Sequence, residues 1–190
     1  MPGKRRILVV DDHFEMLEFL RSMLELSNSD YQVLAAPSAE EGLLELRRTA
    51  RSLHSQSRDS SAEHQIDLLI TDVRLPGMSG FDLVRKVRDV RPDLPVMMIT
   101  AYASAQGKEE ANSLGVYRYF EKPLDTDQLL EVVDQAVFGR PAPVINGPAW
   151  RRSVSRRWRR RAVSPCPQVV QRRLRRVRGS IRRYHRVYSC

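Results

Sequence analysis

Short apolar runs alternate with amphipathic segments along residues 1–139, and this alternation restricts the fold more than any other feature of the chain. Five runs have the length and apolar content of buried strands: residues 6–10, 31–36, 67–71, 95–100 and 116–120. The segments between them carry apolar residues every three or four positions, which indicates helices. Strands that alternate with helices form a parallel sheet covered on both faces. We therefore predict an α/β fold, a doubly wound five-stranded parallel sheet with five helices.

Apolar spacing and capping residues locate the expected helices. The first and third are each expected to bury one face, with Phe14, Leu17, Leu20 and Leu24 in the first helix and Phe81, Val84, Val87 and Val90 in the third. The second is expected to open at a capping box starting at Ser38, and the fifth at Asp125 with Gln128. The fourth, over residues 103–114, contains Gly107 and few apolar residues, so we expect a marginal helix that shifts at low cost.

Polar residues stand at the ends of four expected strands. Asp11 and Asp12 follow the first strand, Asp72 follows the third, Thr100 closes the fourth and Lys122 follows the fifth. In doubly wound sheets the ligand site lies beyond the carboxyl ends of the strands. We therefore expect all five residues to line one rim of the sheet.

This set of residue types is suited to phosphoryl transfer. Carboxylates gathered at one rim repel one another unless a cation joins them, and oxygen ligands suit Mg²⁺. A lysine ammonium and a threonine hydroxyl can hold the oxygens of a phosphoryl group, whose transfer depends on positioning and electrostatic stabilisation. Asp72 would then act as a nucleophile that carries phosphate as an acyl phosphate.

Taken singly, each of these residues has an ordinary structural explanation. Asp12 could cap the first helix, Thr100 could be a plain strand-end residue, and Lys122 could be a solvated surface charge. Tyr119 could be an aromatic residue at the edge of the core. Their joint placement at strand ends favours a site. The histidines lack the spacing of metal ligands, and we interpret His13 as a solvated side chain without a partner.

With these motifs in order, residues 5–139 resemble a response-regulator receiver domain, the phospho-acceptor module of two-component signalling. The matching segments are VVDD (9–12), LLITDVRLPGMSGFDLVRKVR (68–88), PVMMITAYA (95–103) and YFEKP (119–123). The resemblance implies phosphorylation of Asp72 and a Mg²⁺ site formed by Asp11, Asp12, Asp72 and the backbone carbonyl of Arg74. It also implies phosphoryl contacts from Lys122 and Thr100, a switch pair of Thr100 and Tyr119, and a cis bond before Pro123.

The same resemblance implies how such a protein works. Its donor would be a histidine kinase or phosphotransfer protein, its output a changed protein-binding surface, and its only catalysis its own phosphorylation and slow dephosphorylation. We expect Arg74 and Tyr102, near the open side of the site, to slow the attack of water on phospho-Asp72. Turnover hydrolysis of the haloacid dehalogenase type is disfavoured, because that mechanism needs an acid at the position of Arg74. A flavodoxin-type carrier would need a Ser/Thr-rich phosphate loop where DDHFE stands.

Charge divides the chain into two parts. Residues 140–190 contain sixteen arginines and no acidic residue, whereas residues 1–139 contain 16 basic and 23 acidic groups, a net charge of −7. We therefore predict a receiver domain over residues 1–139 and a Pro/Gly linker with a basic tail over residues 140–190. No apolar run reaches the roughly 20 residues of a membrane-spanning helix. The two cysteines, Cys166 and Cys190, lie outside the patterned region, and we expect a cytoplasmic protein.

The basic tail allows three interpretations. Apolar residues at alternating spacings of four and three describe a basic amphipathic helix that could contact nucleic acid or an anionic surface: Val170, Leu174, Val177, Ile181, Tyr184 and Tyr188. If the tail contacts DNA, the protein would be a DNA-binding transcriptional regulator. The second interpretation is a disordered tail that neutralises the acidic domain. The third is the product of a shifted reading frame in GC-rich coding sequence.

Overall fold

The computed structural model describes residues 4–51 and 65–139, and the elements it contains strictly alternate between strand and helix. In chain order they are β1 (Arg5–Val10), α1 (Phe14–Ser27), β2 (Tyr31–Ala36), α2 (Ala39–Arg51), β3 (Ile66–Asp72), α3 (Gly80–Val90), β4 (Val96–Thr100), α4 (Ala105–Ser113), β5 (Arg118–Glu121) and α5 (Thr126–Val137). The predicted basic tail and residues 52–64, between α2 and β3, lie outside the described residues.

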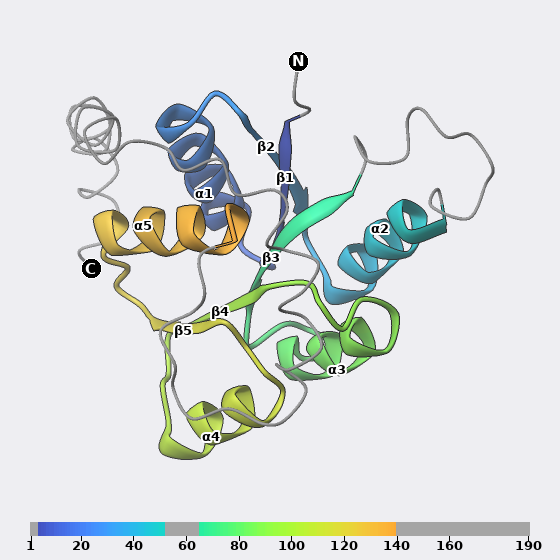
Figure 1. Cartoon of the computed structure of the whole chain (residues 1–190). Coiled ribbons are helices and arrows are strands. Elements are labelled where there is room, and N and C mark those ends of the chain that lie inside the picture. The colour runs from blue at the N-terminus through green and yellow to red at the C-terminus, as the bar shows by residue number, and fades with distance from the viewer. Residues whose placement is uncertain (1–3, 52–64, 140–190) are drawn as a thin grey trace.

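The five strands form one parallel sheet in the order β2-β1-β3-β4-β5 (Figure 1). Because every neighbouring pair is parallel, all the carboxyl ends of the strands meet at one edge of the sheet. Strands β1, β3 and β4 lie inside the sheet and are almost entirely buried. The predicted α/β fold with a five-stranded parallel sheet and five helices is confirmed.

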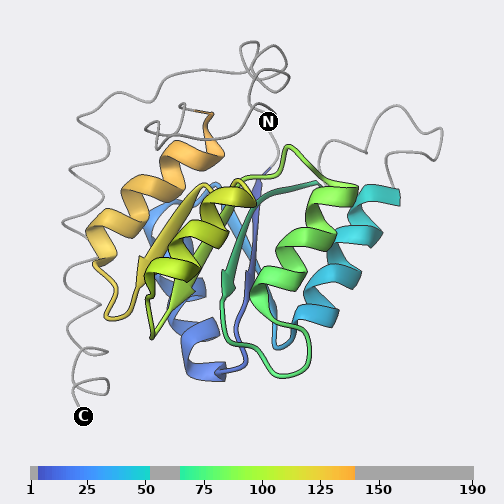
Figure 2. The same ribbon diagram turned by 90° about the horizontal axis from the view of Figure 1, so that it is seen from below.

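Helices cover both faces of the sheet (Figure 2). Helices α1 and α5 enclose one core with side chains such as Ile7, Leu20 and Leu129. Helices α2, α3 and α4 enclose the other with side chains such as Leu8, Leu46 and Val84. Alternate residues of one strand serve the two cores, because successive strand side chains point to opposite faces.

Polar caps set where several helices begin. Ser38 Oγ accepts the backbone N–H of Glu41 at 3.2 Å, and Asp125 Oδ1 accepts that of Gln128 at 3.0 Å, as the sequence predicted. Ser79 and Ser104 cap α3 and α4 in the same way. Each cap satisfies an N–H group that has no partner within its helix.

The structure corrects two of the expected helix faces. Phe14 is 69% exposed, because it is the first residue of α1 and stands beyond the end of β1, where the sheet no longer covers it. Met23 is buried in α1 beside the expected leucines. In α3 the buried side chains are Leu83, Val84 and Val87, whereas Val90 at the last position is 38% exposed.

Helix α4 is short, and its own residues give it little core. It starts two residues later than predicted, and its buried residues are Gly107 and Ala111. A half-buried arginine of α3 anchors its end: Arg88 donates to the carbonyl oxygens of Leu114 at 3.0 Å, Gly115 at 3.0 Å and Leu94 at 2.7 Å. Burial lowers the pKa of Arg88 to about 10, which leaves it a cation at neutral pH. The hydrogen bonds from Arg88 therefore stabilise the carboxyl end of a helix that has few apolar contacts of its own.

The carboxyl end of α5 is fastened at the edge of the sheet where the strands begin. The Tyr31 hydroxyl of β2 donates to Asp134, and the Tyr31 ring stacks on Phe138 with centroids 6.3 Å apart. The Arg5 guanidinium lies 5.7 Å from the centroid of the Phe138 ring. Helix α5 therefore runs from one edge of the sheet to the opposite one. None of the helices among the described residues is long and apolar enough to cross a membrane.

Candidate functional site

Strand register brings the predicted rim residues together. Val10 of β1 pairs with Thr71 of β3, so Asp11 and Asp72 leave neighbouring strands at the same level. Asp72 pairs with Ile99 of β4, one residue before Thr100. Thr100 in turn pairs with Glu121 of β5, and the backbone N–H of Lys122 donates to the Thr100 carbonyl at 2.7 Å. The fold therefore places these side chains at one rim without any special loop.

Lys122 joins the two buried carboxylates of this rim. Its Nζ lies 2.7 Å from Asp72 Oδ2 and 3.3 Å from Asp11 Oδ2. Asp11 is 2% exposed and Asp72 is 7% exposed, so both carboxylates are largely removed from water. The peptide bond between Lys122 and Pro123 is cis. A positive charge between two buried acids offsets a repulsion that would otherwise oppose folding.

Burial and neighbouring charges shift the pKa values of Asp11 and Lys122. Burial raises the pKa of Asp11, against the opposing effects of the His13 backbone N–H and of Lys122. Burial alone would lower the pKa of Lys122, but the hydrogen bond to Asp72 and the charges of both acids raise it. Lys122 is therefore a cation at neutral pH, while Asp11 lacks part of the stabilisation that a carboxylate needs.

His13 has partners that the sequence did not reveal. Its Nδ1 lies 3.2 Å from Asp11 Oδ1 and 3.1 Å from Asp12 Oδ1, so its interpretation as a side chain without a partner was wrong. The ring is 68% exposed, so the apolar pattern of the sequence could not indicate its contacts with the two acids. The sequence feature that could have indicated them is the position of His13 directly after Asp11 and Asp12. His13, not Asp12, is the residue that precedes α1, which removes the helix-capping explanation of Asp12.

The loop after Asp72 is held close to it. Asp72 Oδ1 accepts the backbone N–H of Arg74 at 2.9 Å, and the N–H of Gly80 donates to the Val73 carbonyl at 3.0 Å. A side chain on Gly80 would run into the backbone carbonyl of Asp72, so this position admits only glycine without a shift of the backbone. The loop and the start of α3 therefore fix the direction of the Asp72 side chain.

Glu40 of α2 supports the same loop from outside. Its carboxylate accepts the backbone N–H of Met78 at 3.1 Å and lies beside Gly77, which has a positive φ of 76°. Sequence reasoning gave Glu40 no role, because the contact joins residues 38 positions apart in an exposed region. An acid in the first turn of a helix is ordinarily explained by the helix dipole alone.

Arg74 and Tyr102 lie against each other at the open side of the site. The Arg74 guanidinium is 4.3 Å from the centroid of the Tyr102 ring, which is a cation–π contact. Tyr102 is 66% exposed. The two residues predicted to tune the lifetime of a phosphoryl group therefore form one unit between the loop of β3 and the loop of β4.

Thr100 and Tyr119 connect the rim to α4. Thr100 is fully buried, and its hydroxyl accepts the backbone N–H of Tyr102 at 3.2 Å. Tyr119 packs partly buried against the core under α3 and α4. Burial raises the pKa of Tyr119, and hydrogen bonding to Thr100 lowers it in part. The two predicted switch residues therefore lie near each other.

The residues present fit a hard divalent cation. The ligand atoms of Asp11, Asp12 and His13 lie within 4.8 Å of one another, and Asp72 shares Lys122 with Asp11. The buried Asp11, with its raised pKa, is the kind of carboxylate that a metal ion stabilises in its charged form. The acidic cluster is compatible with Mg²⁺, which favours carboxylate oxygens and retains water ligands.

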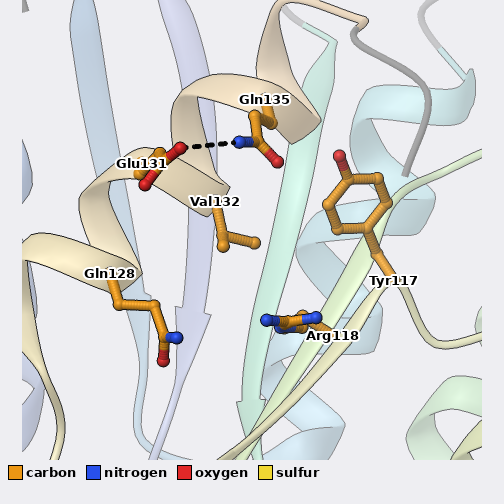
Figure 3. Close-up of a pocket in the computed structure, with 6 residues that line it drawn as sticks. All are labelled: Tyr117, Arg118, Gln128, Glu131, Val132 and Gln135. Carbon is orange, nitrogen blue, oxygen red and sulfur yellow. Dashed lines mark hydrogen bonds between the residues drawn. The ribbon is translucent and has the colours of Figure 1, made fainter. Parts of the chain in front are cut away.

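A separate hollow of about 160 Å³ lies between β5 and α5 (Figure 3). Tyr117 and Arg118 line it from the strand side, and Gln128, Glu131, Val132 and Gln135 line it from α5. Its one carboxylate, Glu131, accepts the Gln135 amide at 3.2 Å. Among the described residues that line this hollow there is no second acid and no lysine, so the carboxylates and the ammonium group of the rim have no equivalent here.

Known proteins resemble the chain over the same region. The family described as the response regulator receiver domain matches residues 7–134. The transcriptional regulatory protein GlrR of Escherichia coli is 30% identical over 165 residues, covering 87% of this chain and 31% of GlrR. The response regulator protein PilR of Pseudomonas aeruginosa is 32% identical over 71% of this chain and 26% of PilR. The chain thus spans less than a third of the length of these two relatives.

Solved structures agree with the sequence comparison. A CheY-like receiver domain from Methanospirillum hungatei has a TM-score of 0.58 at 28% identity, covering 71% of this chain and 94% of that one. A response regulator receiver protein from Pseudomonas putida has a TM-score of 0.57 at 30% identity, covering 71% and 99%. Fold, rim residues and relatives lead to the same assignment: this chain belongs to the response-regulator receiver family, a family of signalling domains that receive their signal from a histidine kinase or phosphotransfer partner.

Proposed function

We propose that this protein is a phosphorylation-controlled switch in the cytoplasm, and that Asp72 is the residue that accepts the phosphoryl group. The contact of Lys122 Nζ with both Asp72 and Asp11 carries the proposal. A buried acid at a strand end with its own ammonium group is positioned for the charge of an incoming phosphate, because that ammonium can turn to a phosphoryl oxygen. Asp67 of the same strand, by contrast, contacts the Arg5 guanidinium and the Arg6 backbone N–H at the other end of the sheet.

The proposed reaction is a single displacement at phosphorus. A carboxylate oxygen of Asp72 attacks the phosphorus of a phosphohistidine on the partner, and the P–N bond breaks. The electron pair of that bond goes to the imidazole nitrogen, and an acyl phosphate forms on Asp72. Asp11, Asp12, Asp72 and the backbone carbonyl of Arg74 would hold Mg²⁺, which when bound neutralises the charge of the phosphoryl oxygens. The backbone N–H of Arg74 keeps the carboxylate oriented throughout.

Thr100 and Tyr119 are proposed to report the phosphoryl group to the surface. A phosphoryl oxygen on Asp72 would draw the Thr100 hydroxyl, and Tyr119 would then follow into the space beneath Thr100. The proximity of the two residues and the marginal core of α4 support this step. The surface of α4, β5 and α5 would change as a result and bind or release a downstream protein.

Hydrolysis of the acyl phosphate is proposed to be slow. The Arg74–Tyr102 pair lies at the open side of the site and would hinder water from reaching phosphorus. In this proposal the protein catalyses its own phosphorylation and slow dephosphorylation and has no other substrate.

The test is direct phosphorylation of the full chain. Phosphoramidate contains a P–N bond like that of phosphohistidine, so the protein is incubated with phosphoramidate and Mg²⁺ and examined by intact-mass and peptide mass spectrometry. We expect a mass increase of one phosphoryl group on the peptide that carries Asp72. Asp72→Asn should abolish the increase, whereas Asp89→Asn, at an exposed acid of α3, should retain it. An unmodified natural protein, or a fully modified Asp72→Asn variant, would refute the proposal.

Control of transcription is a second candidate function. It is favoured by the similarity to GlrR, a transcriptional regulatory protein, and to PilR, a response regulator protein, and by the sixteen arginines of residues 140–190. Nuclease footprinting of the full chain distinguishes the candidates. Protection of a defined DNA site would support gene control, whereas weak affinity that ignores sequence and falls with salt would reflect charge alone.

A further inference from the structure

Gly107 is a buried glycine inside the shortest helix of the described residues, and its backbone does not explain its presence. Its φ is not among the positive values, so other residues could adopt this conformation. Glycine is the least favourable helix residue after proline, and α4 has few apolar contacts to offset that disadvantage. The position must therefore be explained by the space around it.

The space beside Gly107 is occupied by the hydroxyl of Tyr119. A methyl group at position 107 would lie 3.0 Å from the Tyr119 Oη and 3.1 Å from the Ser104 Oγ. The Tyr119 Cζ would lie at 3.8 Å, which is an ordinary contact. A side chain at position 107 would therefore be crowded by the hydroxyl oxygen of Tyr119 and not by its ring carbons.

The two crowded atoms differ in their freedom to move. Ser104 is the N-cap of α4, and its Oγ accepts the Gly107 N–H at 3.0 Å, so moving it would uncap the helix. Tyr119 Oη is the tip of a side chain that can rotate away from α4. That rotation would also take the hydroxyl away from Thr100, which is near enough to lower the pKa of Tyr119.

We infer that Gly107 is a positioning residue for the switch, since it leaves the room in which the Tyr119 hydroxyl rests on the first turn of α4 beside Thr100. The inference rests on the proposed roles of Thr100 and Tyr119. It adds that the first turn of α4 senses the position of the Tyr119 ring through this one close approach. A methyl group at position 107 favours the arrangement with the ring turned away.

A double-mutant cycle on the full chain tests the inference without any phosphodonor. The variants are Gly107→Ala, Tyr119→Phe and their combination, with Asn112→Ala as the control for helix propensity at an exposed position of α4. The crowding at Ser104 is the same in both backgrounds and cancels. We expect Gly107→Ala to lower the urea midpoint or leave it unchanged in the natural background and to raise it in the Tyr119→Phe background. Asn112→Ala should raise the midpoint equally in both.

A second readout follows the ring itself. In protein labelled with 3-fluorotyrosine, the ¹⁹F resonance of Tyr119 is identified by its loss in Tyr119→Phe. In Gly107→Ala we expect this resonance to show a larger shift between H₂O and D₂O, as a ring exposed to solvent does. A glycine with a merely structural role in α4 would leave the Tyr119 resonance unmoved.

The outcomes separate the two proposals. Equal midpoint shifts for Gly107→Ala in both backgrounds, or an unmoved Tyr119 resonance, would overturn the inference and leave Asp72 as a phosphate acceptor. A failure of Asp72 to take phosphate would remove the proposed function but not the measured coupling. If Gly107→Ala does not fold, folding of the double variant supports the inference, and failure of both variants overturns it.

Discussion

The Lys122 ammonium and the Asp72 carboxylate lie 2.7 Å apart although the residues are separated by 50 positions in the chain. Asp11 shares the same ammonium at 3.3 Å. Lys122 follows β5, Asp72 ends β3 and Asp11 follows β1, so this ammonium group links charged side chains from the ends of three strands. Removing the ammonium leaves two buried carboxylates side by side.

We expect Lys122→Met to destabilise the protein in the absence of divalent cations. Loss of one partner from this mostly buried cluster should cost about 1–3 kcal/mol of the free energy of unfolding, less than for a fully buried pair because water reaches part of the site. Mg²⁺ should restore much of the loss, because it binds the folded state alone. Urea unfolding with and without Mg²⁺ measures both effects, and Lys108→Met at an exposed position is the control.

Lys122→Met should also bind Mg²⁺ more tightly than the natural protein, since a positive charge has left the site. A Mg²⁺ affinity that is unchanged or weaker would contradict the electrostatic account of the rim.

Replacement of Arg74 or Tyr102 by alanine should shorten the lifetime of phospho-Asp72. An exposed cation–π contact contributes about 0.5–1 kcal/mol, which corresponds to roughly a two- to fivefold faster loss of phosphate. Because the two side chains act as one unit, the double variant should lose phosphate no faster than the more affected single variant. The measurement is the decay of the phosphorylated protein after removal of the donor. Additive effects of the two changes would show that each residue acts alone.

Arg88→Met should weaken the attachment of α4 to α3. The change leaves three carbonyl groups without their cationic donor, at an expected cost of about 2–4 kcal/mol in the free energy of unfolding. Hydrogen exchange should accelerate most in residues 105–116, where local contacts are few. Lys86→Met, at an exposed position of α3, should change neither quantity. Uniform acceleration across the whole domain would argue against a local anchor.

Gly80→Ala should displace the backbone of Asp72, although the two residues are eight positions apart in the sequence. The new methyl group meets the backbone of Asp72 and Val73, which cannot rotate away, so we expect a loss of about 2–3 kcal/mol and weaker Mg²⁺ binding. At Gly42 the new methyl group would meet the side chain of Val10, and Gly42→Ala should leave Mg²⁺ affinity unchanged. Equal loss of Mg²⁺ affinity in the two variants would contradict this assignment.

The strands and most of the rim could be predicted because each depends on local pattern. The runs that became β1, β3 and β4 lie inside the sheet and are almost entirely buried, so their apolar content identifies them within a residue or two. The start of β5 was predicted two residues too early: the expected range began at residue 116, but the strand starts at Arg118. The N–H of Val116 still donates to the Ala111 carbonyl in α4, and the N–H of Tyr117 donates to the Val96 carbonyl of β4. Periodicity does not record where hydrogen bonding begins.

Contacts between distant segments were beyond the sequence pattern. Phe14 has the spacing of a buried residue, and only the end of the sheet leaves it in solvent. In the sequence, Gly107 indicates only a weak helix. The close approach of the Tyr119 hydroxyl, which leaves little room for a side chain at this position, is visible only in the structure. Glu40 and His13 are polar, so the spacing of apolar residues could not predict their contacts with Met78 and Asp11.

Helix α5 starts just after the cis peptide bond at Lys122 and ends where Phe138 meets Arg5 and Tyr31. Its twelve residues span about 18 Å, the full depth of the sheet. The helix thus acts as a brace on this face of the sheet. Its carboxyl end cannot slide along β2 without breaking the contacts of Tyr31 with Asp134 and Phe138.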